Sequence, residues 1–351
     1  MVVTIVAFIV SLVVIILAHE LGHFATAKIA GVRVDEFGIG FPPRLFSVKR
    51  GDTIYSINAF PIGGFVKVAG EEDPSAPGGL ASKSIPARLL FLSAGSIMNL
   101  LLPFLLLSIA FMVPHQEVIG QVVVEEVAPN SPAAEAGIVP GDIFLSVNGK
   151  PVNNTSDVSR LFYTHLGSKF TAVIQHSDST TEEVELTARW KPPEDEGAVG
   201  VAIITQDATV VTQRYSWKAI PMGAGRCFET LVLFKNGIIS MIIGEIPVEF
   251  TGPVGIAQLT GEVAKGGISP ILELAAFVSI NLGIINLFPI PSLDGGRIIF
   301  VLLEWVRRGK RVSAKTERLI HSIGFILLIG AILAVTYKDI LRLVTGESLI
   351  P

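Results

Sequence analysis

Residues 2–30 read VVTIVAFIVSLVVIILAHELGHFATAKIA, an apolar run that ends around the pattern His-Glu-Leu-Gly-His. At about 1.5 Å per residue, the stretch from Val2 to Ala18 covers roughly 25 Å, which leaves His19 inside or at the edge of a hydrocarbon core about 30 Å thick. Neither a basic leader nor a small-residue cleavage pattern accompanies this run. We therefore predict a retained membrane span and not a cleaved signal peptide.

The composition is that of a membrane protein. Half of the 351 residues are hydrophobic, 17% are charged, and the mean hydropathy is +0.60. The formal net charge of -4 provides no basic excess to neutralise a phosphate backbone, so nucleic acid is not an expected partner. Cys227 is the single cysteine of the sequence, which excludes a disulfide within the chain.

Four apolar stretches are long enough to cross a bilayer, which predicts a polytopic α-helical membrane protein with four transmembrane helices. They are residues 2–30, 89–113, 271–290 and 319–337. The connections 31–88 and 297–318 are rich in lysine and arginine and are predicted to be cytoplasmic. The first and third spans then run in parallel, so their C-terminal ends lie at similar depth.

Two parts between the spans are predicted to contain β-structure. Within the first cytoplasmic connection, residues 53–68 hold two short β-prone runs that predict a membrane-associated hairpin, either solvated or dipping into the bilayer beside the site. Residues 114–208 predict a small extracytoplasmic α+β domain, with alternating strands around one helix at 156–166. Residues 209–270 are semi-apolar and predict interfacial helices outside the membrane.

The pattern His19-Glu20-Leu21-Gly22-His23 predicts a zinc site on the first span. Positions four apart on a helix share a face, so the imidazoles of His19 and His23 can bind one zinc ion, and the neighbouring Glu20 is suited to be the general base. In a soluble helix this short pattern is more often a solvated polar face. Ionisable groups at the end of an apolar helix instead need a compensating partner, which zinc supplies.

A catalytic zinc site needs a third protein ligand and an open position for water. His115, His165 and His176 fall in the external segment and His321 begins the fourth span, which makes them poor candidates. Asp294 follows the third span, and the parallel orientation of the first and third spans places it at the depth of His19 and His23. Taken alone, Asp294 before two glycines is more typical of a turn or a helix cap than of a metal ligand.

These motifs resemble the site-2 proteases, peptidase family M50, and among them the bacterial enzymes of regulated intramembrane proteolysis that carry a PDZ domain. HELGH on the first span and NLFPIPSLDGG at the third occur in the order of that family. The blocks PIGGFVK, AGSIMN, PNSPAAEAGIVPGDIFLSVNG and TGPVGIAQ agree with it over nearly the whole chain. Many relatives have proline after the glycine of AGSIMN, where this sequence has serine.

The resemblance implies that His19, His23 and Asp294 bind one Zn²⁺ ion and that Glu20 activates the water. It also implies two groups of residues that hold an extended substrate. Asn281 and Asn286 belong to the third span, and Pro61, Gly63, Gly64 and Phe65 belong to the hairpin. The two asparagines are equally suited to hydrogen bonds between helices. The external domain resembles a PDZ module, which is expected either to read a peptide or to act as a size filter.

The leading hypothesis is an intramembrane zinc endopeptidase of the bacterial inner membrane. By resemblance, it cleaves single-span proteins such as anti-sigma factors or remnant signal peptides, after an earlier extracytoplasmic cut. Its expected partners are these transmembrane substrates and membrane lipid. The alternatives are a non-proteolytic PDZ scaffold and a metal transporter. The intact HExxH pattern and Asp294 argue against the scaffold, and the lack of an inverted repeat argues against the transporter.

The domain organisation expected from the sequence has eight parts. In order they are a first transmembrane helix with HExxH, a cytoplasmic-side loop with the hairpin, a second transmembrane helix, the PDZ domain, interfacial helices, a third transmembrane helix with the LDG motif, a basic loop, and a fourth transmembrane helix with a tail. Their ranges are 1–30, 31–88, 89–113, 114–208, 209–270, 271–296, 297–318 and 319–351.

Overall fold

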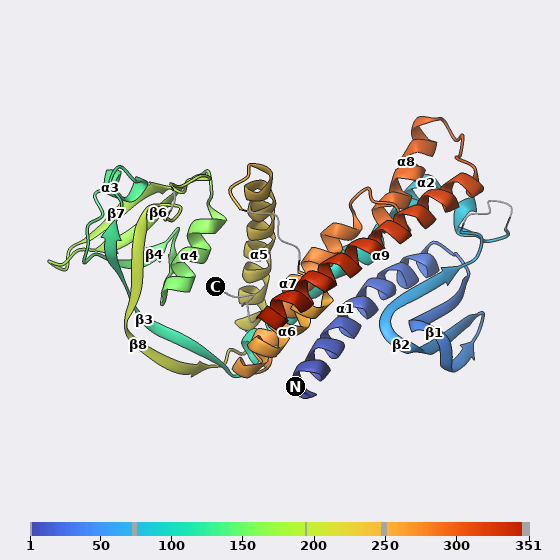
Figure 1. Ribbon diagram of the computed structural model, residues 1–351, viewed down its shortest axis with the longest axis horizontal. Helices are drawn as coiled ribbons and strands as arrows, with labels where there is room; N and C mark the ends of the chain where they lie inside the picture. The colour runs from blue at the N-terminus through green and yellow to red at the C-terminus, as the bar shows by residue number, and fades with distance from the viewer. Residues whose placement is uncertain (1, 72–75, 194, 247–250, 346–351) are drawn as a thin grey trace. The chain divides into compact units, whose positions relative to one another are not determined.

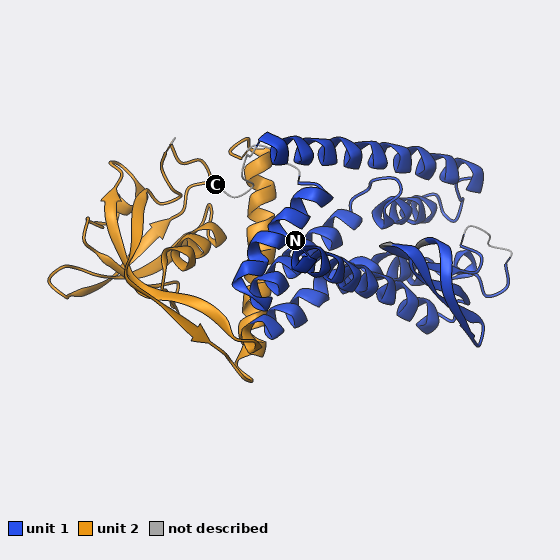
Figure 2. Cartoon of the chain, turned by 60° about the horizontal axis from the view of Figure 1, so that its bottom comes forward, with its two compact units in different colours: residues 1–110, 250–351 blue, residues 111–249 orange. Residues whose placement is uncertain are grey.

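The computed structural model describes residues 2–71, 76–193, 195–246 and 251–345. The chain forms two compact units, which are coloured separately in Figure 2. Unit 1 contains residues 1–110 and 250–351, and unit 2 contains the intervening residues 111–249. Unit 2 is therefore an insertion within the sequence of unit 1.

Among the described residues, unit 1 contains four helices of membrane-spanning length and composition, which confirms the predicted number of apolar helices (Figure 1). They are α1 (Val2–Ile29), α2 (Ile85–Met112), α7 (Ile268–Asn286) and α9 (Ala314–Thr345). Most of their apolar side chains are not buried within the protein, and only 6% of the most apolar window of α9 is buried. Helices of this kind need lipid around them, so the chain is an integral membrane protein.

Short elements connect these helices. Unit 1 also contains the 3-10 helices η1 (Leu80–Ser82) and η2 (Ala264–Gly266), and the helix α6 (Pro253–Val263). A cluster of buried apolar side chains joins α1, α2 and the β-ribbon of this unit, which is the pair of strands formed by residues 34–50 and 53–68. Its members are Ala27, Val32, Val34, Val68, Leu80, Phe91, Leu92 and Val301. This cluster anchors the C-terminal half of α1, which carries the HExxH pattern.

The third membrane-length helix ends earlier than the sequence suggests. Helix α7 ends at Asn286, and a tight turn leads into a separate helix, α8 (Asp294–Val306). The expected basic loop 297–318 is therefore helical up to Val306. Pro289 and Pro291 account for the break, because neither can donate a backbone hydrogen bond to continue the helix.

The connection 31–88 contains a β-hairpin, as predicted, but its two strands are not the two runs expected within residues 53–68. Residues 53–68 form one long strand, β2 (Thr53–Val68), and its partner is β1 (Val34–Arg50). The two β-prone runs of β2 do not pair with each other, because residues 64–68 pair with 34–39, and residues 53–58 pair with 44–50. The sequence of β1 contains Pro42, Pro43 and several charges, which obscured its strand character.

Unit 2 is built on a sheet whose main strand order is β7-β6-β4-β3-β8. The predicted strands and helix are present as β3 (His115–Val127), β4 (Ile143–Val147), β6 (Lys169–Gln175), β7 (Thr181–Thr187), β8 (Val201–Gln213) and α4 (Thr155–Thr164). The helix α3 (Pro132–Glu135) and the strand β5 (Lys150–Pro151), which pairs with β4, were not predicted. The Asn154 side chain accepts a hydrogen bond from Asp157 N at 2.9 Å and so caps the start of α4.

The core of unit 2 lies between its sheet and α4. Phe144, Val158, Leu161, Phe170 and Ile174 are buried there. Strand β8 continues to Gln213, beyond the expected end of the domain at residue 208. Helix α5 (Ala219–Ile242) follows, and it packs on α4 through Asn236, whose Nδ2 donates to the Tyr163 carbonyl at 2.7 Å.

Candidate metal centre

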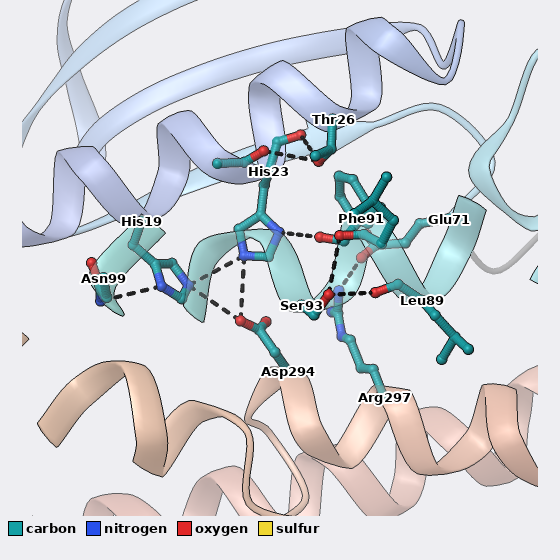
Figure 3. A network of polar contacts seen from close by, with 12 residues as sticks. His19, His23, Thr26, Glu71, Leu89, Phe91, Ser93, Asn99, Asp294 and Arg297 are labelled. Atoms are coloured by element: carbon teal, nitrogen blue, oxygen red, sulfur yellow. Dashed lines mark hydrogen bonds and ion pairs between the residues drawn. The ribbon is translucent and has the colours of Figure 1, made fainter. Parts of the chain in front are cut away.

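The two histidines of the HExxH pattern lie on one face of α1, as their spacing predicts. The Nε2 atoms of His19 and His23 are 3.2 Å apart (Figure 3). The side chains are 14% and 9% exposed, so both imidazoles are removed from solvent. Buried imidazole nitrogens that face each other need a shared partner.

The carboxylate of Asp294 is that partner. Its Oδ2 atom lies 3.2 Å from His19 Nε2 and 3.3 Å from His23 Nε2. In Figure 3, Asp294 points from the start of α8 toward both rings. Asp294 therefore lies beside the two histidines, where the sequence analysis expected it.

Two glycines allow Asp294 to reach this position. A Cβ atom on Gly295 would lie 2.1 Å from the Phe288 carbonyl oxygen, and one on Gly296 would lie 2.5 Å from the Ile290 carbonyl oxygen. The turn between α7 and α8 therefore folds directly over the first turn of α8. Only residues without a side chain fit at these two positions, which explains the sequence Asp-Gly-Gly.

The three ligand atoms form a triangle with edges of 3.2, 3.2 and 3.3 Å. A tetrahedral zinc ion with bonds of about 2.0–2.1 Å to nitrogen and oxygen requires its ligand atoms to be about 3.3–3.4 Å apart. Two imidazoles and one carboxylate are also a donor set found in catalytic zinc sites. Within the described residues, His19, His23 and Asp294 are thus a group that fits one zinc ion and leaves a fourth position open.

Helix α2 fixes the orientation of both imidazoles from behind. His23 Nδ1 donates to the Phe91 carbonyl oxygen at 2.8 Å, which directs Nε2 toward Asp294. The Asn99 amide lies 3.4 Å from His19 Nδ1. When Nε2 of a histidine binds metal, Nδ1 carries the hydrogen, so a half-turn of the Asn99 amide would present its oxygen as the acceptor.

The contacts of the imidazoles with the Phe91 carbonyl and Asn99 depend on close packing of α1 on α2. A Cβ atom on Gly95 would lie 2.4 Å from His23 Nε2 and 2.5 Å from His19 Cε1. On the other side of the contact, a Cβ atom on Gly22 would lie 2.4 Å from the Ala94 carbonyl oxygen. Small residues at such crossings let helix backbones approach closely in membranes. Gly95 belongs to the AGSIMN block, whose role the sequence alone did not reveal.

Glu20 faces away from α2 and toward the β-ribbon. It lines a small cavity with Ile16, Gly38 and Gly64. A Cβ atom on Gly64 would lie 2.8 Å from Glu20 Cγ, so β2 approaches the carboxylate closely. The ribbon and the carboxylate are therefore neighbours across this cavity.

The other residues predicted to hold substrate occupy different positions. Gly63 lines the same cavity as Glu20, and the Phe65 ring packs over Gly38. The side chain of Pro61 lies outside the described part of the structure. Asn281 donates to the Phe277 carbonyl of its own helix at 2.8 Å, and Asn286 is the last residue of α7. Neither asparagine belongs to the group of ligand atoms among the described residues.

Sequence reasoning missed the groups that surround the ligands. Besides the Phe91 carbonyl and Asn99, Arg297 pairs with Glu71 one helical turn after Asp294 (Figure 3). A polar residue such as Asn99 within an apolar helix was the available signal, because it needs a partner in the membrane. A backbone carbonyl has no such signal in the sequence.

An HExxH helix whose imidazoles meet a carboxylate from another element, within a unit of membrane-length helices, is the arrangement of a membrane-embedded zinc metalloprotease. The chain belongs to peptidase family M50, whose family model matches residues 7–331. It is accordingly a zinc metalloprotease that uses Zn²⁺.

Full-length relatives agree with this family. A Clostridium perfringens protein named as a zinc metalloprotease is 35% identical over 336 residues, which cover 93% of this chain and 95% of the relative. The zinc metalloprotease RasP of Oceanobacillus iheyensis is 30% identical, with 97% of this chain and 99% of the relative covered. The regulator of sigma-W protease RasP of Bacillus subtilis is 28% identical with the same coverage.

Proposed function

We propose that His19, His23 and Asp294 hold the zinc ion and that the protein cleaves transmembrane substrates within the bilayer. The observation that carries this proposal is the triangle of ligand atoms, with edges of 3.2–3.3 Å, on a helix of membrane-spanning composition. A metal-binding scaffold without activity would not need the adjacent Glu20. When bound, zinc polarises water and the scissile carbonyl.

Glu20 is the proposed general base. Its carboxylate accepts the proton of the attacking water and returns it to the nitrogen of the leaving amine. The cavity that it shares with Gly38 and Gly64 is lined mainly by apolar side chains, including Ile16. Little water surrounds the carboxylate there, which favours transfer of the proton to a bound substrate over exchange with solvent.

The β-ribbon is proposed to hold the substrate beside Glu20. A transmembrane helix hides its peptide bonds, so it must unwind before cleavage, and its freed backbone groups must be satisfied. Gly63 and Gly64 of β2 line the cavity of Glu20, which supports pairing of the segment from Gly63 to Phe65 with an unwound substrate as an added strand. Asn281 and Asn286 are proposed to assist from α7.

The exposed apolar side chains of the ribbon favour its insertion into the membrane over a solvated position. Leu45 is 70% exposed, Phe46 62% and Phe60 59%. Exposed apolar side chains of this size are costly in water and stable in lipid. The ribbon therefore supports a site that substrates reach from within the bilayer.

The proposed substrates are single-span membrane proteins whose extracytoplasmic part has already been removed. The name of the Bacillus subtilis relative, a regulator of sigma-W protease, favours anti-sigma factors, and remnant signal peptides are the second class. We propose that the sheet and α4 of unit 2 are a PDZ module on the extracytoplasmic side. Basic residues of the connections 31–88 and 297–318 favour a cytoplasmic position for the active site in a bacterial inner membrane.

Substitution of Glu20 tests the proposal. Glu20→Gln keeps the size of the side chain and removes the base, so the purified variant should retain zinc and lose cleavage of a reconstituted single-span substrate. The measurement compares zinc content with product formation in the same proteoliposomes. Full turnover by Glu20→Gln would show that another group is the base and would refute the assignment.

A further inference from the structure

The turn that precedes Asp294 contacts α9, the fourth membrane-length helix. Ser292 lies two residues before Asp294 and has a φ of 80°, a left-handed conformation that is unfavourable for a residue with a side chain. Such a conformation persists when surrounding contacts enforce it. The contacts that do so come from α9.

One contact is a hydrogen bond to the backbone of the strained residue itself. Ser292 N donates to His321 Nδ1 at 2.9 Å. The His321 ring packs on Phe300 of α8, with ring centroids 5.5 Å apart, which fixes the direction of Nδ1. The imidazole thus connects the turn to α8 and α9.

The other contact is close packing one helical turn further along α9. A Cβ atom on Gly324 would lie 2.4 Å from Pro291 Cβ and 2.6 Å from the Pro291 carbonyl oxygen. Gly324 is one of two buried residues in α9, whose apolar surface is otherwise largely exposed. Contacts with the protein are therefore sparse along α9, and one of them falls on this turn.

We infer that His321 is a positioning residue, which together with Gly324 holds the Pro291–Ser292 turn so that the Asp294 carboxylate meets His19 and His23. The fourth membrane-length helix then determines how tightly the site holds its zinc, although it contributes no ligand. This inference rests on the proposed role of Asp294 as a zinc ligand.

Paired variants of His321 test the hydrogen bond. Asn at position 321 retains an acceptor near the position of Nδ1, whereas Leu removes it. We expect His321→Leu to bind zinc about tenfold more weakly and to alter the visible spectrum of the cobalt-substituted protein. His321→Asn should stay close to the wild type in both measurements.

A second substitution separates positioning from general packing. Glycine adopts a φ of 80° without strain, so Ser292→Gly should restore much of the zinc affinity of His321→Leu. A loss caused only by poor packing of α9 would not be restored in this way. If His321→Leu folds poorly, Gly324→Ala provides an independent variant, because its methyl group displaces Pro291 and should also weaken zinc binding.

The outcomes distinguish this inference from the assignment beneath it. Asp294→Ala should lose zinc more severely than any of these variants, and retention of zinc there would refute the ligand assignment and the inference together. If Asp294→Ala loses zinc but His321→Leu does not, only the inference fails. The inference also fails if His321→Asn binds zinc as weakly as His321→Leu does. It fails as well if Ser292→Gly does not restore the zinc affinity of His321→Leu, or if Gly324→Ala binds zinc as the wild type does.

Discussion

Gly95 sets how closely α2 approaches the two imidazoles. Because its Cβ position is 2.4–2.5 Å from atoms of His23 and His19, even a methyl group must push the rings or the helix away. We expect Gly95→Ala to weaken zinc binding by about tenfold or more, the range known for changes behind metal ligands. Zinc content after dialysis against a weak chelator measures this effect.

Gly330 provides a matched control for this substitution. It also lies in a membrane-length helix, but no atom comes within 4 Å of its Cβ position. Gly330→Ala should therefore bind zinc as the wild type does. Equal zinc content in both variants would show that the contact between Gly95 and the imidazoles is not required.

His176 links pH to the stability of unit 2. Its Nδ1 lies 2.8 Å from Asp142 Oδ1 and its Nε2 3.1 Å from Glu182 Oε2. Hydrogen bonds to Asp142, and then to Glu182, raise the pKa of His176 above its usual value near 6.5. The charged imidazole therefore stabilises the folded state fully below about pH 6.5, and this contribution is lost as the pH rises through the raised pKa.

We expect amides of β4 and β6, next to His176, to exchange hydrogen faster at pH 8 than at pH 6 after correction for intrinsic exchange. Mass spectrometry of exchange in the intact protein measures this difference. His176→Gln should remove the pH-dependent part. An unchanged pH dependence in that variant would assign it to other groups.

Among the elements, the β-ribbon is the one whose environment tests the proposed access of substrate from the bilayer. Phe46 and Ile57 are register partners and are 62% and 52% exposed. In a bilayer, we expect a cysteine at Phe46 to be protected from a membrane-impermeant thiol reagent. A cysteine at Asp52, in the turn of the same ribbon, should react readily.

The native cysteine, Cys227, should react only slowly with the thiol reagent and so should contribute little background signal. Cys227 is fully buried, and burial raises the pKa of its thiol to about 11, so little thiolate exists near neutral pH. Equal rates for Phe46→Cys and Asp52→Cys would place the ribbon in water. That result would contradict a substrate strand held within the membrane.

The sequence predicted the elements whose signal is local. The four membrane-length helices follow from their apolar runs, and His19 and His23 share a face because of the helical period. Asp294 was selected as the third candidate ligand because the two basic connections imply that the first and third spans are parallel. Strand β1 was missed because its prolines and charges resemble a loop.

The surroundings of the metal site were the part that a single sequence did not predict. The Phe91 carbonyl carries no side-chain signal, and the importance of Gly95 appears only when α1 and α2 cross. The hydrogen bond between Ser292 and His321 likewise joins two residues that are 29 positions apart, one in a turn and the other in α9. Each of these depends on packing, which periodicity and motif spacing do not encode.

At the scale of the whole molecule, the metal site belongs entirely to unit 1. Its proposed ligands come from sequence on both sides of the insertion, with His19 and His23 before unit 2 and Asp294 after it. An ion pair also joins the two parts, because Glu304, after the insertion, accepts from Arg88, before it, at 2.6 Å. Unit 2 is therefore inserted into the sequence of a membrane unit that contains all three proposed ligands.

X-ray absorption at the zinc edge of the purified protein tests whether His19, His23 and Asp294 bind the zinc ion. We expect two imidazole nitrogens and two oxygens, one from Asp294 and one from water, at about 2.0–2.1 Å. Zinc that remains in Asp294→Ala should have lost the carboxylate. A sulfur ligand, or the same zinc content and coordination in that variant, would contradict the proposed site.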